Sequence, residues 1–101
     1  MAHFLVEYRD VGTPETREKF RAEHIAYRKG LGQAMSLAGP ILDDAGSATG
    51  SLVILEAHDR AAAKLLATRD PYVAAGVLQL SSVRGYRIAA MKPPEGAAVG
   101  G

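Results

Sequence analysis

The chain alternates between two hydrophobic periodicities, which predict strands and helices in turn. Phe4, Val6 and Tyr8 alternate with other residues over positions 3–8, and this period of two is typical of a strand. From residue 14 to about residue 29, apolar residues recur at helical spacing, which predicts an amphipathic helix. The same criteria predict strands over residues 35–42, 50–57 and 77–90, and a second helix over residues 60–69.

Residues suited to begin and end helices lie at the predicted boundaries. Thr13 can cap the first helix, and Pro14 suits its first position because the N–H that proline lacks would be unpaired there. Gly30 and Gly32 are expected to end this helix. Asp59 can cap the second helix as Thr13 caps the first.

Glycine and proline also mark irregularities in and around the predicted strands. Gly39 and Pro40 break the second strand, and a proline there indicates an edge strand or a bulge because it cannot donate a ladder hydrogen bond. The last strand is expected to form two pieces around Arg84 and Gly85. Residues 9–12 are predicted to form a polar loop between the first strand and the first helix.

The predicted order of elements is β-α-β-β-α-β, the order of the ferredoxin-like α+β fold. In that fold an antiparallel four-stranded sheet carries both helices on one face. The strands nevertheless have apolar residues on both faces, as Leu5 beside Phe4 and the run from Leu52 to Leu55 indicate. Two helices on one face leave the other face bare. We therefore expect the same face of a second copy to cover it, in a sheet-to-sheet homodimer.

Length and composition indicate one folded domain. The chain has 101 residues, of which 48% are hydrophobic and 23% charged, and these values are ordinary for a single globular domain. We expect this domain to span residues 1–91. Residues 92–101 are rich in proline, glycine and alanine without periodicity, so a C-terminal tail is predicted there.

Charge and residue content argue against several classes of function. A net charge of +1 gives no global electrostatic basis for binding nucleic acid or an anionic membrane. The third predicted strand also lacks the stacking aromatic residues of an RNA-recognition module, which shares this order of elements. The sequence has no cysteine, no apolar run of membrane-spanning length and no signal-peptide pattern. A cytoplasmic protein without nucleic-acid or membrane partners is therefore expected.

His24 and Asp70 are the candidate catalytic residues. His24 lies on the apolar stripe of the first predicted helix, between Phe20 and Tyr27, so its side chain is expected to point inward. Asp70 precedes Pro71, and the proline places it at the end of the second helix. Both helices lie on the same face of the expected sheet, so the two side chains can meet. A carboxylate on one ring nitrogen would fix the histidine tautomer and leave the other nitrogen free to move a proton.

Several short motifs, taken in order, resemble the YCII-related (YciI-like) domain family. They are His24, Ala38-Gly39-Pro40, Gly50-Ser51 and Asp70-Pro71-Tyr72 followed by Gly76, and the resemblance extends from Phe4 to about Ile88. It implies a dimer of the α+β-barrel superfamily, with a His–Asp pair at His24 and Asp70. It also implies hydrolase-like or dehydrochlorinase-like chemistry, including elimination of chloride from a chlorinated hydroxyquinol. Tyr72 stands where the family often has phenylalanine.

Two functions remain open. In the first, the chain is a small-molecule enzyme that uses His24 and Asp70 for general acid–base chemistry, such as elimination or hydrolysis, with no cofactor. No metal is expected, because the three histidines lack metal-ligand spacing. The residues expected to line the substrate pocket are Ser51, Pro40, Tyr72 and Tyr27. Arg17 could bind an anionic substrate, but a solvated helix flank is the interpretation we favour. In the second function, a dimeric module binds a small ligand in the same pocket without turnover.

Overall fold

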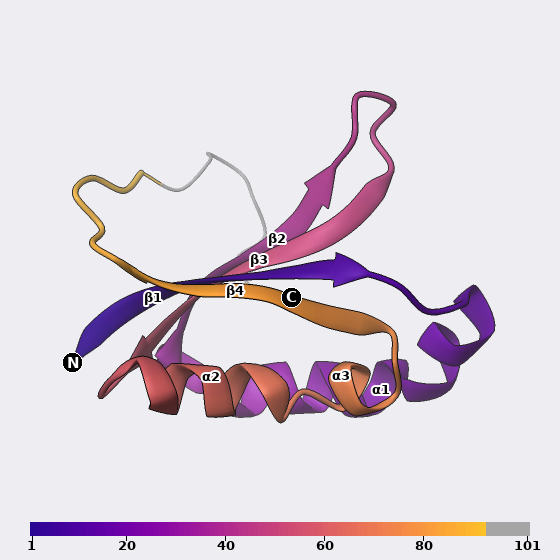
Figure 1. Cartoon of the computed structure of the whole chain (residues 1–101), viewed down its shortest axis with the longest axis horizontal. Coiled ribbons are helices and arrows are strands. Elements are labelled where there is room, and N and C mark those ends of the chain that lie inside the picture. The colour runs from indigo at the N-terminus through magenta and orange to yellow at the C-terminus, as the bar shows by residue number, and fades with distance from the viewer. Residues whose placement is uncertain (93–101) are drawn as a thin grey trace.

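The computed structural model describes residues 1–92, and its main strands and helices follow the predicted order (Figure 1). The elements in chain order are β1 (Ala2–Asp10), α1 (Pro14–Gly30), η1 (Gly32–Ala34), β2 (Met35–Leu42), β3 (Ala48–Ala57), α2 (Arg60–Thr68), α3 (Pro71–Ala74) and β4 (Leu78–Tyr86). The element η1 is a turn of 3₁₀ helix that the pattern did not predict. Of the expected tail at residues 92–101, all but Lys92 lie outside the described residues.

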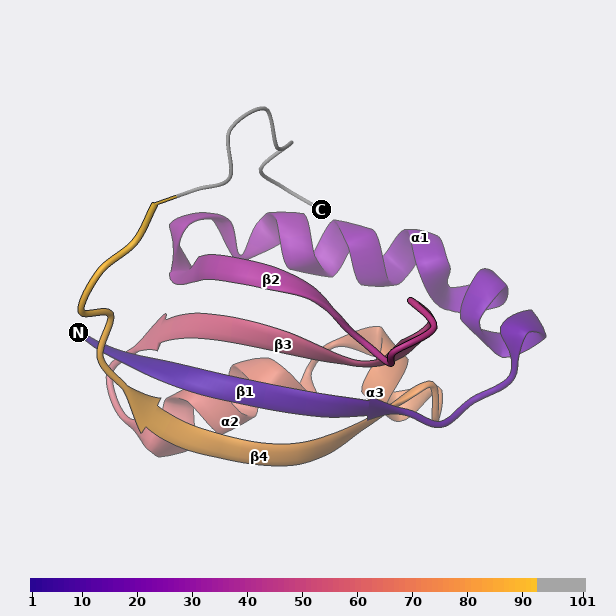
Figure 2. The same cartoon turned by 90° about the horizontal axis from the view of Figure 1, so that it is seen from above.

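The four strands form one antiparallel sheet in the order β2-β3-β1-β4, with the helices on one of its faces. Figure 2 shows the strands side by side in this order, with α1 along the β2 side and α2 beneath β1 and β4. The predicted ferredoxin-like α+β arrangement is therefore confirmed. Within residues 1–92, no helix combines the length and the hydrophobicity needed to cross a membrane.

The hydrophobic core lies between the sheet and the helices. Phe4 pairs with Leu55 and Val6 pairs with Val53 in the register of β1 and β3, so these side chains share the inner face of the sheet. The buried cluster also contains Tyr8, Ala57, Ala63, Ala67, Tyr72, Val77, Leu78 and Val83. Alternate residues of β1 and of β3 therefore belong to the core, as the period of two predicted.

Both predicted helix caps are present. The Thr13 hydroxyl accepts a hydrogen bond from the backbone N–H three residues later at 3.2 Å, and the Asp59 carboxylate does the same at 2.8 Å. Each cap satisfies a donor that has no partner inside the helix. At the other end of α1, Gly32 has a φ of +56°, a left-handed conformation that glycine adopts without a steric penalty. The chain therefore leaves the helix where the glycines predicted.

The predicted break in β2 is wrong, although its predicted edge position is confirmed. β2 pairs with β3 alone and runs without interruption through Gly39 and Pro40. At a sheet edge, a missing N–H need not remove a ladder hydrogen bond, which explains why the proline is tolerated. The register shifts of β2 lie near its two ends, between Met35 and Leu37 and after Ile41.

The last strand does not form two pieces. β4 is a single strand in which Gly85 stays paired with Phe4 of β1. Its last residue, Tyr86, pairs with His3, and β1 begins only one residue before that histidine. Residues 87–90 therefore have no neighbouring strand to pair with, and β4 stops short of the predicted end.

β1 is longer than predicted and includes half of the expected polar loop. Arg9 pairs with Gly50 on one side and with Gln79 on the other, and Asp10 pairs with Leu78. Two neighbouring strands thus offer hydrogen-bond partners to residues whose polarity suggested a loop. As a result the backbone of Asp10 is held in the sheet.

The outer face of the sheet, opposite the helices, carries a group of apolar residues. Leu37, Ile54 and Leu5 lie next to one another across β2, β3 and β1. Ile41 and Leu52 belong to the same face by their register. We call these five residues the outer strip. Leu37 is 50% exposed and Ile41 is 37% exposed, so part of the outer strip is uncovered in the single chain.

Gly50→Ala is expected to destabilise the protein, because a Cβ at this position would lie 2.2 Å from the Tyr8 carbonyl oxygen. Overpacking of this kind costs about 1–3 kcal/mol, which corresponds to a fall in the melting temperature of roughly 4–8 °C per kcal/mol for a domain of this size. Thermal unfolding followed by circular dichroism measures the change. Gly85→Ala is the matched control, since nothing lies within 4 Å of its Cβ position. Equal melting temperatures for the two variants would contradict the prediction.

Candidate functional site

Asp70 lies at the turn between α2 and α3, in the interior of the protein. α2 ends at Thr68, and the Asp70 carboxylate caps α3 by accepting a hydrogen bond from the Tyr72 N–H at 3.0 Å. Pro71 takes the first position of α3, where its missing N–H leaves no donor unpaired. Asp70 is only 1% exposed. The local backbone therefore fixes a charged group away from water, where it needs further partners.

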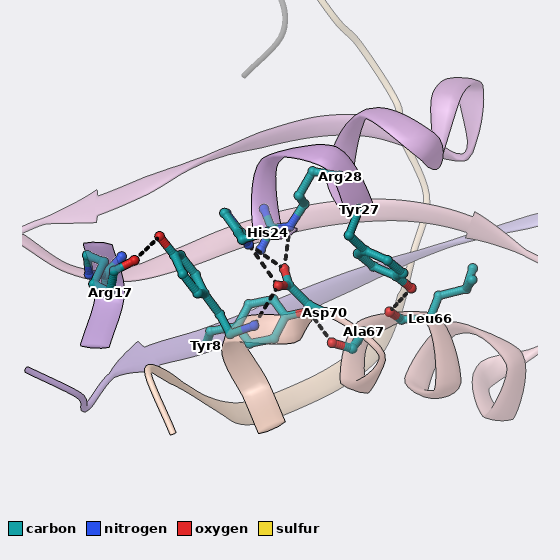
Figure 3. A network of polar contacts seen from close by, with 9 residues as sticks. Tyr8, Arg17, His24, Tyr27, Arg28, Leu66, Ala67 and Asp70 are labelled. Carbon is teal, nitrogen blue, oxygen red and sulfur yellow. Dashed lines mark hydrogen bonds and ion pairs between the residues drawn. The ribbon is translucent and has the colours of Figure 1, made fainter. Parts of the chain in front are cut away.

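His24 of α1 is one of these partners (Figure 3). Its Nδ1 atom lies 2.8 Å from both carboxylate oxygens of Asp70. An ionised carboxylate only accepts hydrogen bonds, so Nδ1 carries the proton of the neutral imidazole and Nε2 is the acceptor. The His24 side chain is 18% exposed, so the ring is not sealed in the core. The structure thus brings together the two residues that the sequence singled out, and their catalytic roles stay a prediction.

Arg28 is another partner of Asp70, and it was not predicted from the sequence. Its Nε donates a hydrogen bond to the Asp70 carboxylate at 2.9 Å, and its side chain is 10% exposed. Arg28 follows His24 by four residues, so one turn of α1 presents both side chains to the same carboxylate. This spacing was the available signal, but a basic residue in the last turn of a helix is ordinarily assigned to solvent and to the helix dipole.

The partners of Asp70 together keep it ionised. Burial by itself raises the pKa of the carboxyl group. Hydrogen bonds from the His24 ring, the Tyr72 N–H and the Arg28 guanidinium act in the opposite direction and outweigh it, so the pKa of Asp70 lies below its ordinary value. The site therefore holds a fixed negative charge beside the imidazole at neutral pH.

Tyr72 covers one face of the His24 ring. The two rings are stacked, with their centroids 3.9 Å apart and their planes at 10°. The Tyr72 hydroxyl donates a hydrogen bond to the backbone carbonyl of Arg17 at 3.1 Å, which anchors the far end of the tyrosine to α1. A ligand can therefore reach the imidazole only at its Nε2 edge or on its other face.

His24 lines a cavity of about 290 Å³. Ser51, Pro40 and Tyr72, which were predicted at the pocket, also line it. The Ser51 hydroxyl donates a hydrogen bond to the Gly39 carbonyl at 3.4 Å. The other lining residues are Asp10, Arg17, Arg28, Ala38, Gly39, Ala48, Gly50 and Leu78. The cavity thus joins α1 and the turn at α3 to the inner face of the sheet.

Tyr27, which was also predicted at the pocket, is not among the lining residues. Its hydroxyl donates a hydrogen bond to the Leu66 carbonyl of α2 at 2.6 Å. Burial and then the negative charge of Asp70 raise the pKa of this hydroxyl. Tyr8 makes a similar contact with the next carbonyl of α2, that of Ala67, at 2.7 Å. Both tyrosines therefore join α2 to its neighbours, and Tyr27 has a structural position.

Asp10 and Arg17 form an ion pair beside the cavity. The Asp10 Oδ1 and Arg17 Nη2 atoms are 3.2 Å apart. The guanidinium carbon of Arg17 also lies 5.3 Å from the centre of the Tyr72 ring. From the sequence, Asp10 was predicted to lie in a loop and Arg17 on a solvated helix flank, because no local pattern indicated that β1 extends toward α1. The described residues contain no cluster of three or more His, Asp or Glu side chains suited to a metal ion.

Asp70→Asn is expected to destabilise the protein most at neutral pH and less as the pH falls. The folded-state pKa of Asp70 lies below its unfolded-state value of about 3.9. Its contribution is therefore complete above that value and is lost as the pH falls through the folded-state pKa. At pH 7 the substitution leaves the Arg28 charge buried without its partner, which costs roughly 3 kcal/mol. Urea unfolding of both proteins between pH 7 and pH 2.5 measures the difference.

Asp44→Asn is the matched control for this titration. It makes the same change of charge at an exposed turn residue. The control variant should follow the natural protein at every pH, because an exposed carboxylate without partners contributes little to stability. A stability difference for Asp70→Asn that stays constant across the whole pH range would contradict the assigned role of the carboxylate charge.

Comparisons with known proteins agree with this fold. The chain matches the YCII-related domain over residues 1–87. A solved structure similar to this one is the 5-chloro-2-hydroxyhydroquinone dehydrochlorinase TftG from Burkholderia phenoliruptrix AC1100, in complex with 2,5-dihydroxybenzoquinone. The similarity has a TM-score of 0.59 at 25% sequence identity, and it covers 83% of this chain and 91% of that one. A comparison with curated proteins found no match. Because the family match spans most of the sequence, the chain belongs to the YCII-related domain family.

Proposed function

We propose that this protein is a small-molecule enzyme in which His24 acts as a general base and Asp70 holds it in place. The observation that carries the proposal is the 2.8 Å contact between the His24 Nδ1 atom and a buried, ionised carboxylate, beside a cavity that the same histidine lines. This arrangement fixes the tautomer in which Nε2 can accept a proton. A proton acceptor held in this way needs no bound cofactor.

The proposed substrate is a small hydroxylated ring that carries a chlorine atom. Support comes from the similar structure, whose protein acts on such a ring. The cavity of about 290 Å³ is also at the small end of the range for ligand pockets, which suits a single ring. Ser51, Pro40 and Tyr72 would form the walls that contact it.

The proposed reaction is the elimination of hydrogen chloride. In one keto tautomer of a chlorinated hydroxyhydroquinone, the ring carbon that carries chlorine has gained a proton and is saturated. His24 Nε2 takes the proton of a ring hydroxyl, the O–H electron pair forms a new carbonyl, and the conjugated electrons expel chloride. The proton on the imidazole and the departing chloride together account for the HCl lost, so the step needs no oxidant. Asp70 stabilises the imidazolium through its hydrogen bond to Nδ1.

His24→Gln is expected to lower the rate of chloride release from 5-chloro-2-hydroxyhydroquinone by about 10²–10⁴-fold, the usual effect of losing a general base. Asp70→Asn should lower it by up to roughly 10⁴-fold, because the wrong tautomer is then allowed. Chloride release is measured with the purified protein, and circular dichroism checks the fold of each variant. His58→Gln is the matched control, since it makes the same substitution at an exposed histidine.

The outcomes of this assay separate the two functions left open by the sequence. Loss of chloride release in the His24 and Asp70 variants, with retention in the His58 variant, supports the enzyme. A natural protein that binds the ring without releasing chloride would instead support a ligand-binding module. Equal rates of chloride release in all variants would show that His24 is not the general base.

We also propose that two copies associate through the outer strip, sheet against sheet. The support is the apolar character of these five residues and the exposure of Leu37 and Ile41. Burying such side chains in a second copy removes apolar surface from water, which is the main driving force for association. In this arrangement the cavity lies on the other side of each sheet and stays open to ligand.

Leu37→Asp is expected to separate the dimer while the fold is kept, because Leu37 is half exposed in the single chain and therefore adds little to its core. Val53→Asp should instead prevent folding, since Val53 is 2% exposed and faces the helices. Equilibrium sedimentation gives the mass of each species, and circular dichroism reports the fold. A natural protein that sediments as a monomer at micromolar concentration would show that no sheet-to-sheet dimer forms.

A further inference from the structure

The charged groups around the cavity are balanced pair by pair. Asp10 pairs with Arg17 at 3.2 Å, and Asp70 pairs with Arg28 at 2.9 Å. Besides these four residues and Tyr72, the cavity lining contains one other ionisable side chain, that of His24. His24 and Arg28 both contact the Asp70 carboxylate. With a neutral imidazole, the two cations and two anions sum to zero. The Nη2 atom of Arg28 has no hydrogen-bond partner among the described residues, but it is buried. A ligand that arrives with a negative charge therefore finds no exposed guanidinium without a carboxylate partner in this set.

Asp10 neutralises the one exposed guanidinium of this set, that of Arg17. Arg28 is buried and committed to Asp70, but the Arg17 side chain is 40% exposed and lies beside the cavity. A free guanidinium at that place would bind a carboxylate well, because its planar array of donors matches the two carboxylate oxygens. The Asp10 carboxylate already binds the guanidinium, in the place that a ligand carboxylate would take. Its backbone is held by pairing with Leu78 at the end of β1, so it is a fixed neighbour of Arg17.

We propose that Asp10 is a specificity-determining residue that makes the cavity select neutral hydroxylated rings over rings that arrive as carboxylate anions. The inference rests on the proposed function, because a neutral ring hydroxyl can give its proton to His24 after it has bound. The anion then forms only as the imidazolium forms beside it, so the new charges are paired. A ring carboxylate would bring its charge in unpaired and would lie near the Asp10 carboxylate, which repels it.

The experiment compares two small rings that differ in charge. Hydroquinone is neutral at pH 7.5, and 2,5-dihydroxybenzoate carries the same two hydroxyls with an added carboxylate. The natural protein should bind hydroquinone more tightly, as measured by isothermal titration calorimetry at low salt. Asp10→Asn should raise the affinity for the benzoate by about three- to five-fold, the scale of a partly exposed ion pair. Its affinity for hydroquinone should stay within about two-fold, because a neutral ring is indifferent to the freed charge.

Two further variants identify the source of the change. Asp44→Asn raises the net charge by the same amount at an exposed turn away from the cavity lining, and it should leave both affinities unchanged. Adding Arg17→Gln to Asp10→Asn should abolish the gain for the benzoate, since the freed guanidinium is then absent. The gain in affinity for the benzoate should also be smaller at 500 mM salt than at 50 mM, because the screening length is about threefold shorter at the higher salt.

Several results would overturn the proposal. They are tighter binding of the benzoate by the natural protein, no change in charge preference in Asp10→Asn, the same gain in Asp44→Asn, a gain that survives Arg17→Gln, or no binding of either ring. These measurements do not depend on turnover. If Asp10→Asn changes the charge preference but the natural protein releases no chloride in the assay above, the proposed enzymatic function is rejected and the role of Asp10 in selecting ligands is kept. If chloride is released but Asp10→Asn leaves both affinities unchanged, the enzymatic function is kept and the role of Asp10 in selecting ligands is rejected.

Discussion

One buried carboxylate ties the helical layer of this protein together. Asp70 accepts hydrogen bonds from two side chains of α1, His24 and Arg28, and from the Tyr72 N–H of its own turn. An unpartnered buried carboxylate would cost far more than any single hydrogen bond contributes. The helix α1 therefore cannot shift away from the turn between α2 and α3 without leaving charges unpaired. The interaction that docks the helix is also the one that orients the imidazole.

The space beside His24 comes from small residues on two neighbouring strands. Pro40 of β2 and Gly50 and Ser51 of β3 line the cavity, and they leave room where larger side chains would fill the core. Gly50 also lets β3 pass close to the Tyr8 carbonyl of β1. Regular strands therefore form much of the pocket wall, which gives it a fixed shape. The stacked Tyr72 ring closes one face of the imidazole.

The period of two along each strand separates two roles of the sheet. Ser51 faces the cavity while its neighbour Leu52 belongs to the outer strip, and Val53 faces the core while Ile54 belongs to the outer strip. Adjacent residues thus act on opposite sides of the molecule. A polar site and an apolar outer face can therefore be built from the same strands without interfering with each other.

Local patterns along the chain were enough to predict the order of elements, both helix caps and the positions of His24 and Asp70, because periodicity, capping and proline geometry act over a few residues. The folded chain was needed to show that Arg28 shares Asp70 with His24, that β4 is continuous and that Asp10 pairs with Arg17. Each of these depends on which distant segment lies alongside. A strand continues for as long as a neighbouring strand supplies hydrogen-bond partners. A charged side chain points inward when it can pair with a buried group of opposite charge. No local pattern carries that information.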